Sequence, residues 1–364
     1  MDQTQLAVLA LLAIVEDERR KHCRSLWTRQ WIRQRDNGRG TIHMLHHELR
    51  LQDAESFRNF TRMDEDVFSK LLSIIGSDIC CQDTNMRQSI KPLSTDSHFK
   101  TFPTGETFQS LGYAIRIAPN TLSKIIPETL QAILNNLGNK CIKIPNTANE
   151  WKQVAHSFNL LWQFPHCIGA VDGKKVTFQA PRAAGAYFRD YKGHNSIVLL
   201  AVVDAHYRFL YTNIGANGRV HDGAIFNQSK LSEALQGNNM NLLPPEKVEC
   251  FNGPYLPYVF VADDAFALKP YMMKPDPERG LSKEQKVFNY RLSRAQRVVE
   301  NAFGIMSNKF VVLLNPIRLS PNKVDTIIRT CYVLHNFILE QNPRWYVPGD
   351  IHNISMDSTM EGIP

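Results

Sequence analysis

The sequence SIVLLAVVDA, residues 196–205, is an apolar run long enough to form one complete strand. A strand with apolar residues on both faces is typical of the centre of a sheet that is covered on both sides. Further β-rich segments lie at residues 166–178, 208–215 and 258–264, and the sequence HYRF, 206–209, fits a hairpin between the second and third strands. These patterns predict a sheet that begins with three antiparallel strands.

Helical patterns follow the strands and alternate with them. Apolar residues three and four apart predict helices over residues 222–235, from 282 or 293 to 310, and over 322–340. The sequence FVVLLNPIRL, residues 310–319, lies between the last two helices and is interpreted as another strand. Antiparallel strands followed by alternating helices and strands give the order of a ribonuclease-H-like α/β domain, which we expect over residues 141–340.

The segment before this domain is predicted to be an all-α domain, residues 51–140. It contains an apolar stripe with helical spacing at Val67, Phe68, Leu71, Leu72 and Ile75. Residues 105–134 contain two helical segments joined through Ala118, Pro119 and Asn120, with an Asn or Thr cap at the start of the second. This pair is a helix-turn-helix candidate, although two helices and a turn are common in any helical bundle.

Residues 1–50 are predicted to form a basic helical leader. Lysine and arginine dominate residues 19–39, which also contain Trp27 and Trp31 and a single acid, Asp36. Such a segment suits phosphate binding and base stacking, but it equally suits a localisation signal or a solvated helix face. The net charge of +7 and the pI near 9.0 permit a polyanionic partner without requiring one.

Several classes of protein are disfavoured. The apolar run at residues 6–15 is shorter than a membrane span and leads into acidic residues, so it predicts a buried helix and no membrane association. Seven cysteines with one close pair, Cys80-Cys81, and no Cys-x-x-Cys suggest neither disulfides nor zinc, and hence a reducing, intracellular compartment. The absence of Gly-x-x-x-x-Gly-Lys-Ser/Thr and Gly-x-Ser-x-Gly sequences argues against a nucleoside triphosphatase and a serine hydrolase. Residues 341–364 are predicted to be a flexible tail.

Four carboxylates carry the chemistry that the sequence predicts. They lie at the end or edge of apolar segments, in the contexts GAVDGKK, RVHDGAI, FVADDAF and RVVENAF, as Asp172, Asp222, Asp263 and Glu300. Acidic side chains delivered from separate elements of an α/β core to one place provide the hard oxygen ligands of a Mg²⁺ or Mn²⁺ site. The residues therefore predict a metal-dependent nuclease.

Six segments resemble a known family. They are VDGKKVTF, YKGHNSIVLLAVVDA, GANGRVHDGAIFNQS, VADDAFALKPYMMKP, FNYRLSRAQRVVENAFGIMSNKF and VLHNFI. In this order, over roughly residues 50–340, they resemble the nuclease domain of PIF/Harbinger transposases and of the Harbinger transposase-derived nucleases. By position, Asp172 matches the first aspartate of the family and Asp222 the aspartate of its His-Asp motif. Asp263 matches the aspartate of the Gly-Asp-like motif, and Glu300 matches the glutamate.

The resemblance implies a ribonuclease-H-like fold with a DDE metal site, in which Asp172, Asp263 and Glu300 are catalytic and all four carboxylates are metal ligands. It implies cleavage of DNA and, in a transposase, strand transfer within a homo-oligomer that holds DNA ends. A separate Myb-like DNA-binding protein is often the partner. The DNA substrate and the basic leader suggest the nucleus, with the cytoplasm left open.

One segment departs from the family. Residues 90–104 contain Pro92 and Pro103 and lack the helical stripe expected there, so a non-catalytic DNA- or protein-binding adaptor on the same fold is the competing interpretation.

Each carboxylate also has a plainer interpretation. Asp263 and Asp172 are expected to end neighbouring strands and to share a metal, but Asp264 competes with Asp263, because alternation places these two on opposite faces. Glu300 would reach across from a helix, or would pair with Arg297 one turn away.

Asp222, the basic side chains near the expected site and His335 also have plainer interpretations. Asp222 opens a predicted helix and would otherwise be its N-cap. Basic side chains flank the expected site and could hold phosphates, although an exposed lysine on a loop is the default: Lys174, Lys175, Lys192, His194 and Arg297. His335, in an apolar helix, is expected to be a core histidine whose ring nitrogen is hydrogen-bonded.

Overall fold

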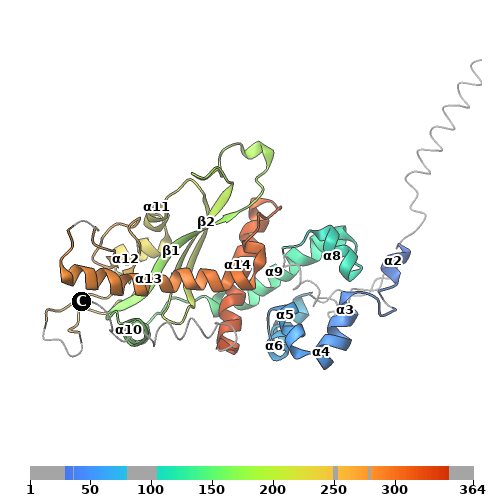
Figure 1. Ribbon diagram of the computed structural model, residues 1–364, viewed down its shortest axis with the longest axis horizontal. Coiled ribbons are helices and arrows are strands. Elements are labelled where there is room, and N and C mark those ends of the chain that lie inside the picture. Colours follow the sequence, from blue (N-terminus) through green and yellow to red (C-terminus); the bar gives the residue numbers. More distant parts are fainter. Residues whose placement is uncertain (1–28, 36, 80–104, 249–252, 278–279, 344–364) are drawn as a thin grey trace, which may run out of the picture.

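The computed structural model describes residues 29–35, 37–79, 105–248, 253–277 and 280–343. These residues form a mixed α/β fold around one five-stranded sheet (Figure 1). Its strands are β1 Cys167–Thr177, β2 Ser196–Val203, β3 Phe209–Asn217, β4 Val259–Val261 and β5 Met272–Met273. They lie in the order β3-β2-β1-β4-β5, so the first strand of the chain is at the centre.

The sheet is antiparallel on one side of β1 and parallel on the other. β1 pairs antiparallel with β2, and β2 pairs antiparallel with β3. The β1–β4 and β4–β5 pairs are parallel. Every residue of β2 is buried, which confirms the doubly covered central strand predicted from its apolar run. The predicted hairpin is also present, because Asp204 accepts hydrogen bonds from the N–H groups of His206 and Arg208, both at 2.9 Å.

Helices cover both faces of the sheet. The long helices α13 Lys283–Lys309 and α14 Pro321–Gln341 pack on one face, and Figure 1 shows α13 running across the strands. Ala170 of β1 and Val261 of β4 belong to the apolar cluster on this face. Because side chains alternate along a strand, Asp172 points to the same face as Ala170.

The opposite face carries smaller helices. α11 Asp222–Asn227 and α12 Lys230–Gln236 form a second apolar cluster with the sheet, which includes Val171 and Phe260. The neighbouring residues 171 and 172 of β1 are therefore directed to different helical layers.

The elements before the sheet are all helices in the part of the chain that the structure describes, in agreement with the helical pattern of residues 51–140, while the prediction of a separate domain there stays untested. These helices are α2 Gln30–Arg33, α3 Thr41–His43, the π-helical η1 Met44–Leu49, α4 Arg50–Gln52, α5 Ala54–Thr61, α6 Glu65–Ile79, α8 Phe108–Ile115, α9 Pro119–Cys141 and α10 Ala148–Trp162. The apolar stripe of α6 is buried at Val67, Phe68, Leu71 and Ile75. One continuous cluster joins these side chains to sheet residues such as Ala201, so the helices and the sheet share a core.

Asn336 of α14 fastens the edge strand β3. Its Nδ2 donates to the carbonyl oxygens of Phe209, at 2.8 Å, and Cys141, at 2.9 Å. Its Oδ1 accepts the N–H of Phe209 at 2.9 Å. One side chain thus satisfies both backbone groups of Phe209 that face away from β2.

Two predicted elements differ in the structure. The helix predicted over residues 222–235 is interrupted, because Ser229 accepts the N–H of Ser232 and caps a second helix, α12. Residues 310–319 do not form a strand: they contain the 3₁₀ helix η4 Val311–Leu313, followed by an irregular segment. Pro316 lacks the N–H that a ladder needs, and pairing is limited to one parallel bridge between Ile317 and Phe178 at the end of β1. Both Val312 and Ile317 are buried.

Other predicted boundaries are settled by local chemistry. α13 begins after Ser282, the earlier of the two predicted starts, where Ser282 and Gln285 form a capping box. The short strand β5 was not predicted. The predicted helix over 322–340 is confirmed within one residue at each end by α14.

The helix-turn-helix candidate consists of α8 and α9. Contrary to the predicted Asn or Thr cap, α9 begins at Pro119 with Ala118 as its N-cap, because proline is well suited to the first helical position. The helix α9 packs against α8, α6 and α14. A DNA-binding role for this pair stays a prediction.

Some predictions concern residues outside the described ranges. These are the buried helix at 6–15, most of the basic leader, the segment 90–104 and all but the first residues of the tail. No helix in the described part of the chain is long and apolar enough to cross a membrane.

Candidate metal centre

The register of β1 and β4 brings Asp172 and Asp263 to the same level of the sheet. Ala170 pairs with Val261 in the parallel ladder, and each aspartate lies two residues further along its own strand direction. Neighbouring strands are separated by about 4.8 Å, so the two carboxylates lie side by side. The prediction that Asp172 ends its strand is wrong, because Asp172 lies in the middle of β1. The pairing of β1 with β4 ends at Ala170, while its pairing with β2 continues to Thr177.

Asp222 enters from the opposite face, as the first residue of α11. Its carboxylate occupies the space above Gly173, where a Cβ would lie 2.2 Å from Asp222 Oδ1. The next residue, Gly223, lies so close to the loop after β4 that a Cβ there would be 2.6 Å from the carbonyl oxygen of Ala265. Two glycines therefore allow α11 to approach both strands that carry the other aspartates.

Glu300 is delivered by α13, which is anchored on β1 at both sides of this residue. One turn before Glu300, Gln296 Nε2 donates to the carbonyl oxygen of Val171 at 3.0 Å. Beyond Glu300, Lys174 Nζ donates to Ser307 Oγ at 2.7 Å. Because both contacts are made to residues that flank Asp172 on β1, the helix cannot slide without breaking one of them.

The carboxylates interact electrostatically. Burial raises the pKa of Asp172 to about 7, against the hydrogen bond from Gly173 N–H, and the charges of Asp263, Asp222 and Glu300 add to the rise. Burial and the charge of Asp263 raise the pKa of Asp222, while Lys175 and His221 oppose this. Burial raises the pKa of Asp263 as well. The three aspartates are partly buried and Glu300 is exposed, and like charges gathered in this way are unfavourable unless a cation binds to them.

The plainer interpretations of the carboxylates are not realised among the described residues. The Asp222 side chain caps no helix, since His221 is the N-cap of α11, and the buried Asp222 Oδ1 accepts no hydrogen bond. Glu300 forms no ion pair with Arg297 within 4.0 Å. Asp264 is 87% exposed and pairs with Lys274 at 2.9 Å, so it is directed away from Asp263's position beside β1.

A divalent cation fits the chemistry of these residues. As the side chains stand, no three His, Cys, Asp or Glu residues in the described ranges are arranged to hold a metal ion. The buried oxygen of Asp222 nevertheless lacks any partner, and the set consists of carboxylates alone, which are the ligands that Mg²⁺ and Mn²⁺ prefer. Holding an ion would require rotation of these side chains toward one another.

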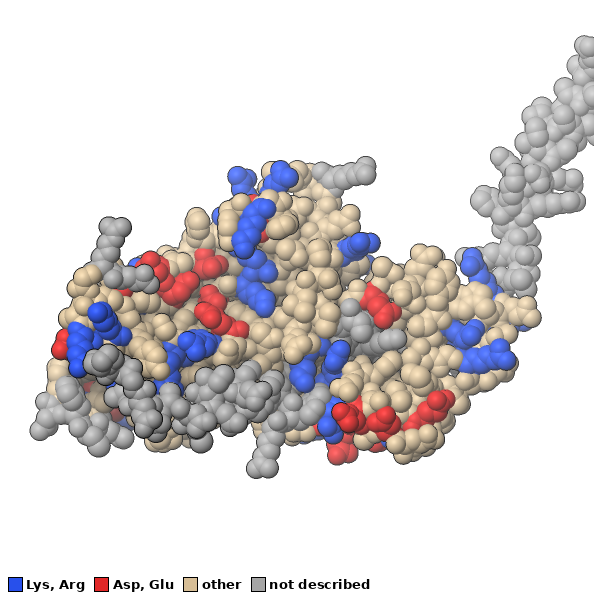
Figure 2. Space-filling model, in the orientation of Figure 1, with Lys and Arg blue, Asp and Glu red and all other residues tan. Residues whose placement is uncertain are grey.

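The basic residues predicted around the site have different environments. Lys174 is engaged with α13 by its bond to Ser307 and by a 3.3 Å bond to the carbonyl oxygen of Phe303. The ammonium groups of Lys175 and Lys192 lie 4.4 and 5.5 Å from the centre of the Tyr191 ring. His194 and Arg297 are exposed. Figure 2 shows a group of acidic side chains beside a column of basic ones over the region of β1 and β2.

Two residues of the site escaped the sequence analysis. Gln296 lies four residues before Glu300 and therefore on the same face of α13, a spacing that could have revealed it. Asp190 organises the loop between β1 and β2, but two of its three hydrogen-bond partners are backbone N–H groups, which leave no trace in the sequence. His335 is confirmed as a core residue: it is fully buried, with Nε2 2.9 Å from the carbonyl oxygen of Tyr207.

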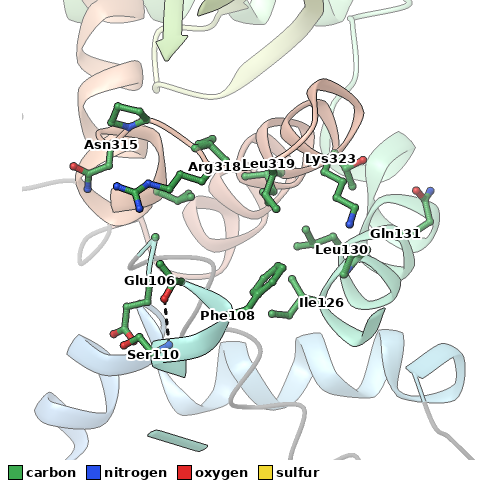
Figure 3. A pocket seen from close by; sticks show the side chains of 18 residues that line it. Glu106, Phe108, Ser110, Ile126, Leu130, Gln131, Asn315, Arg318, Leu319 and Lys323 are labelled. Atoms are coloured by element: carbon green, nitrogen blue, oxygen red, sulfur yellow. Dashed lines mark hydrogen bonds between the residues drawn. The ribbon is translucent and has the colours of Figure 1, made fainter. Parts of the chain in front are cut away.

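A separate pocket of about 640 Å³ lies between α8, α9 and the segment that joins η4 to α14. Figure 3 shows Phe108, Ile126 and Leu130 directed into it. None of the four carboxylates lines this pocket. Glu106 is the one carboxylate among its lining residues, so this pocket lacks the group of carboxylates that a metal centre needs.

Residues 171–336 match the family model described as DDE superfamily endonuclease. The matched segment contains all four carboxylates, Asp172, Asp222, Asp263 and Glu300, and is similar in sequence to that family.

The chain is also similar in sequence to individual proteins. The chain is 22% identical over 298 residues to the Arabidopsis thaliana protein "Protein ALP1-like", a match that covers 79% of this chain and 71% of that protein. It is 24% identical over 298 residues to the Homo sapiens protein "Putative nuclease HARBI1", covering 81% and 78% of the two chains. The resemblance to Harbinger transposase-derived nucleases is thereby confirmed. No solved structure matches the chain.

Proposed function

We propose that this protein is a divalent-metal-dependent DNA endonuclease of the Harbinger transposase type. The observation that carries the proposal is the group of carboxylates on β1, α11, α13 and the loop after β4, whose buried Asp222 Oδ1 lacks a partner. The strand order β3-β2-β1-β4-β5, with three antiparallel strands first, supports a ribonuclease-H-like fold. The relationship to proteins named as nucleases points in the same direction.

In this proposal the four carboxylates hold Mg²⁺ or Mn²⁺. Asp172 and Asp263 act from neighbouring strands, Glu300 from α13 and Asp222 from α11. When bound, the metal would polarise the phosphodiester, lower the pKa of the attacking water and stabilise the leaving 3′-oxygen. Catalytic roles fall to Asp172, Asp263 and Glu300.

The surrounding residues fix the position of the carboxylates and the DNA. Gln296 and Lys174 hold α13 on β1, so that Glu300 stays opposite Asp172. Lys175 and Lys192 offer ammonium groups to the phosphates of the entering strand, and Arg297 offers a third cation from the exposed side of α13.

Further parts of the proposal concern assembly. The basic leader and the helix-turn-helix candidate would contact DNA outside the cleaved phosphate, together with a Myb-like DNA-binding partner. Strand transfer would additionally need a homo-oligomer that holds two DNA ends. Both steps place the protein in the nucleus, with a cytoplasmic pool before import.

A non-catalytic adaptor for DNA or protein is the second candidate. It is favoured by one observation: in the described residues, no three potential ligands are arranged to hold a metal ion as they stand. An adaptor would use the same acidic surface or the helical region as its interface. If it binds through the helical region, loss of a carboxylate would leave its binding nearly unchanged.

Cleavage of supercoiled plasmid separates the two candidates. The purified full-length chain is incubated with Mn²⁺ or Mg²⁺, alone and with a candidate Myb-like partner, beside Asp172→Asn. We expect metal-dependent nicking by the wild type and none by the variant. If neither nicking nor Mn²⁺ binding is detected under any of these conditions, the adaptor is the correct interpretation.

A further inference from the structure

The loop between β1 and β2 presents an aromatic ring to solvent beside the carboxylates. Tyr191 is 79% exposed, the largest exposed fraction of any large apolar side chain in the described residues, and Tyr187 on the same loop is 60% exposed. Exposing an aromatic ring forgoes the burial that normally stabilises it. Such a ring on a loop that is held by its own hydrogen bonds therefore indicates a binding surface.

Asp190 holds this loop in a fixed shape. Its carboxylate accepts the N–H groups of Lys192 and His194, both at 2.9 Å, and the hydroxyl of Ser196 at 3.1 Å. The backbone closes the same turn, because Asp190 N donates to His194 O at 2.8 Å. The residue next to this network, Tyr191, is thus presented on a rigid turn, which lowers the entropic cost of binding a ligand.

Two lysines flank the ring and connect it to the carboxylates. Lys175 Nζ lies 4.4 Å and Lys192 Nζ 5.5 Å from its centre. Lys175 points to the same face of β1 as Gly173, over which the Asp222 carboxylate lies, and the charge of Lys175 opposes the rise in the pKa of Asp222. Tyr191 therefore lies on the side from which Asp222 enters the carboxylate group, and a strand held there could place a base on the ring.

An aromatic face between two ammonium groups suits a nucleobase followed by its phosphates. Stacking on a base is stronger than an exposed cation–π contact, so a base would displace an ammonium group from the ring. The displaced ammonium group is then available to the adjoining phosphate. A fully paired duplex cannot use the ring in this way, because its base faces are already stacked on one another.

We propose that Tyr191, flanked by Lys175 and Lys192, is a stacking platform for an unpaired base of the DNA strand that enters the carboxylate site. The ligand is single-stranded DNA or an unpaired strand end. The inference rests on the proposed function for the choice of DNA, but it concerns binding and not cleavage.

The test measures binding without cleavage. The full-length chain carrying Asp172→Asn is titrated, in EDTA and at low salt, into fluorescent duplexes with and without a single-stranded 3′ overhang. A 2-aminopurine base in the overhang reports stacking through quenching of its fluorescence. Tyr191→Ala is compared with Tyr191→Phe in this background.

A matched control is available on the same molecule. Tyr255 is 67% exposed and has Lys247 Nζ 5.6 Å from its ring centre. It lies near the start of β4, where Leu256 O contacts His166 before β1, and thus at the opposite end of the parallel strands from Asp263. Tyr255→Ala removes the same kind of group far from the carboxylates.

We expect Tyr191→Ala to weaken overhang binding about tenfold and to abolish the quenching, while Tyr191→Phe and Tyr255→Ala bind as the parent does. Unchanged overhang affinity in Tyr191→Ala overturns the platform. An equal loss for fully paired duplex also overturns it, since the ring would then serve no unpaired base. The binding assay needs no catalysis. Absence of cleavage by the wild-type protein would therefore contradict the proposed nuclease activity and leave the measured DNA binding valid.

Discussion

Two aspartates, Asp172 on β1 and Asp190 in the loop between β1 and β2, have opposite environments in this fold. Asp190 accepts three hydrogen bonds from its own loop, which outweigh its burial and hold its pKa below the ordinary value. Asp172 accepts one from Gly173, and burial with three neighbouring acids raises its pKa to about 7. A carboxylate that closes a turn is stabilised by the protein itself, whereas one kept without partners indicates an external cation.

The largest expected effect concerns cleavage. Replacing Asp172 with Asn, or Glu300 with Gln, should reduce metal-dependent plasmid nicking more than about a hundredfold. Even the loss of a residue that only contacts a metal ligand typically lowers metal affinity or activity by about 10–100-fold. Asp264→Asn should cause no such loss, because Asp264 is exposed and forms an ion pair with Lys274. Nicking rates under single-turnover conditions measure this, and equal losses in all three variants would contradict the assignment.

The second prediction concerns stability and pH. The folded pKa of Asp172, about 7, exceeds the ordinary value of 3.8, so the native state retains a proton that the unfolded chain releases. Its stabilising effect is present below about pH 4 and is lost as the pH rises to about 7. Asp172→Asn should therefore stabilise the metal-free protein at pH 8 by about 2–4 kcal/mol relative to its effect at pH 4.

Urea unfolding of wild type and variant in EDTA, at several pH values from 4 to 8, measures this difference. If the free energy of unfolding of the variant follows the same pH dependence as that of the wild type, the folded pKa of Asp172 is not raised.

The opposite behaviour is predicted for Asp190. Asp190→Ala should destabilise the protein by about 2 kcal/mol at pH 7, because two backbone N–H groups and a hydroxyl lose their acceptor. Since its folded pKa is lowered, this contribution is fully present above the ordinary value of 3.8 and should decrease as the pH falls from there through the lowered folded pKa. Denaturation of the variant and of Asp190→Asn, which keeps one acceptor oxygen, checks the result; a neutral Asp190→Ala would remove the contrast with Asp172.

The smallest predicted effect tests whether Asp222 belongs to the same group. In Gly173→Ala the new Cβ must displace the Asp222 carboxylate, so the affinity for Mn²⁺ should fall about tenfold. Gly304→Ala, on α13 one turn after Glu300, meets nothing within 4 Å and is the control. Calorimetric titration with Mn²⁺ distinguishes the two, and equal affinities would exclude Asp222 from the metal centre.

Much of this architecture could be predicted from local sequence. The apolar run of β2, the stripe of α6 and the cap at Ser282 are local signals, and each led to the correct element. The apolar run at residues 310–319 led to the wrong prediction of a strand, because burial among helices and burial in a sheet leave the same apolar pattern.

The arrangement of the site depended on information that is not local. The carboxylates could be named from their contexts, but not the middle position of Asp172 on β1, which follows from where the β4 pairing ends. The anchoring by Gln296 and Lys174 likewise depends on how α13 lies against β1. Such contacts join residues more than a hundred positions apart, and no spacing rule along the chain encodes them.

The amide of Asn336 has a consequence for how this protein behaves in concentrated solution. Edge strands expose unpaired backbone groups that invite another chain to extend the sheet. By bonding both the N–H and the carbonyl of Phe209, Asn336 imitates the peptide group of a neighbouring strand and closes β3 at the point where it begins. One side chain of a helix thereby occupies the backbone groups with which another chain would begin to pair at this end of β3.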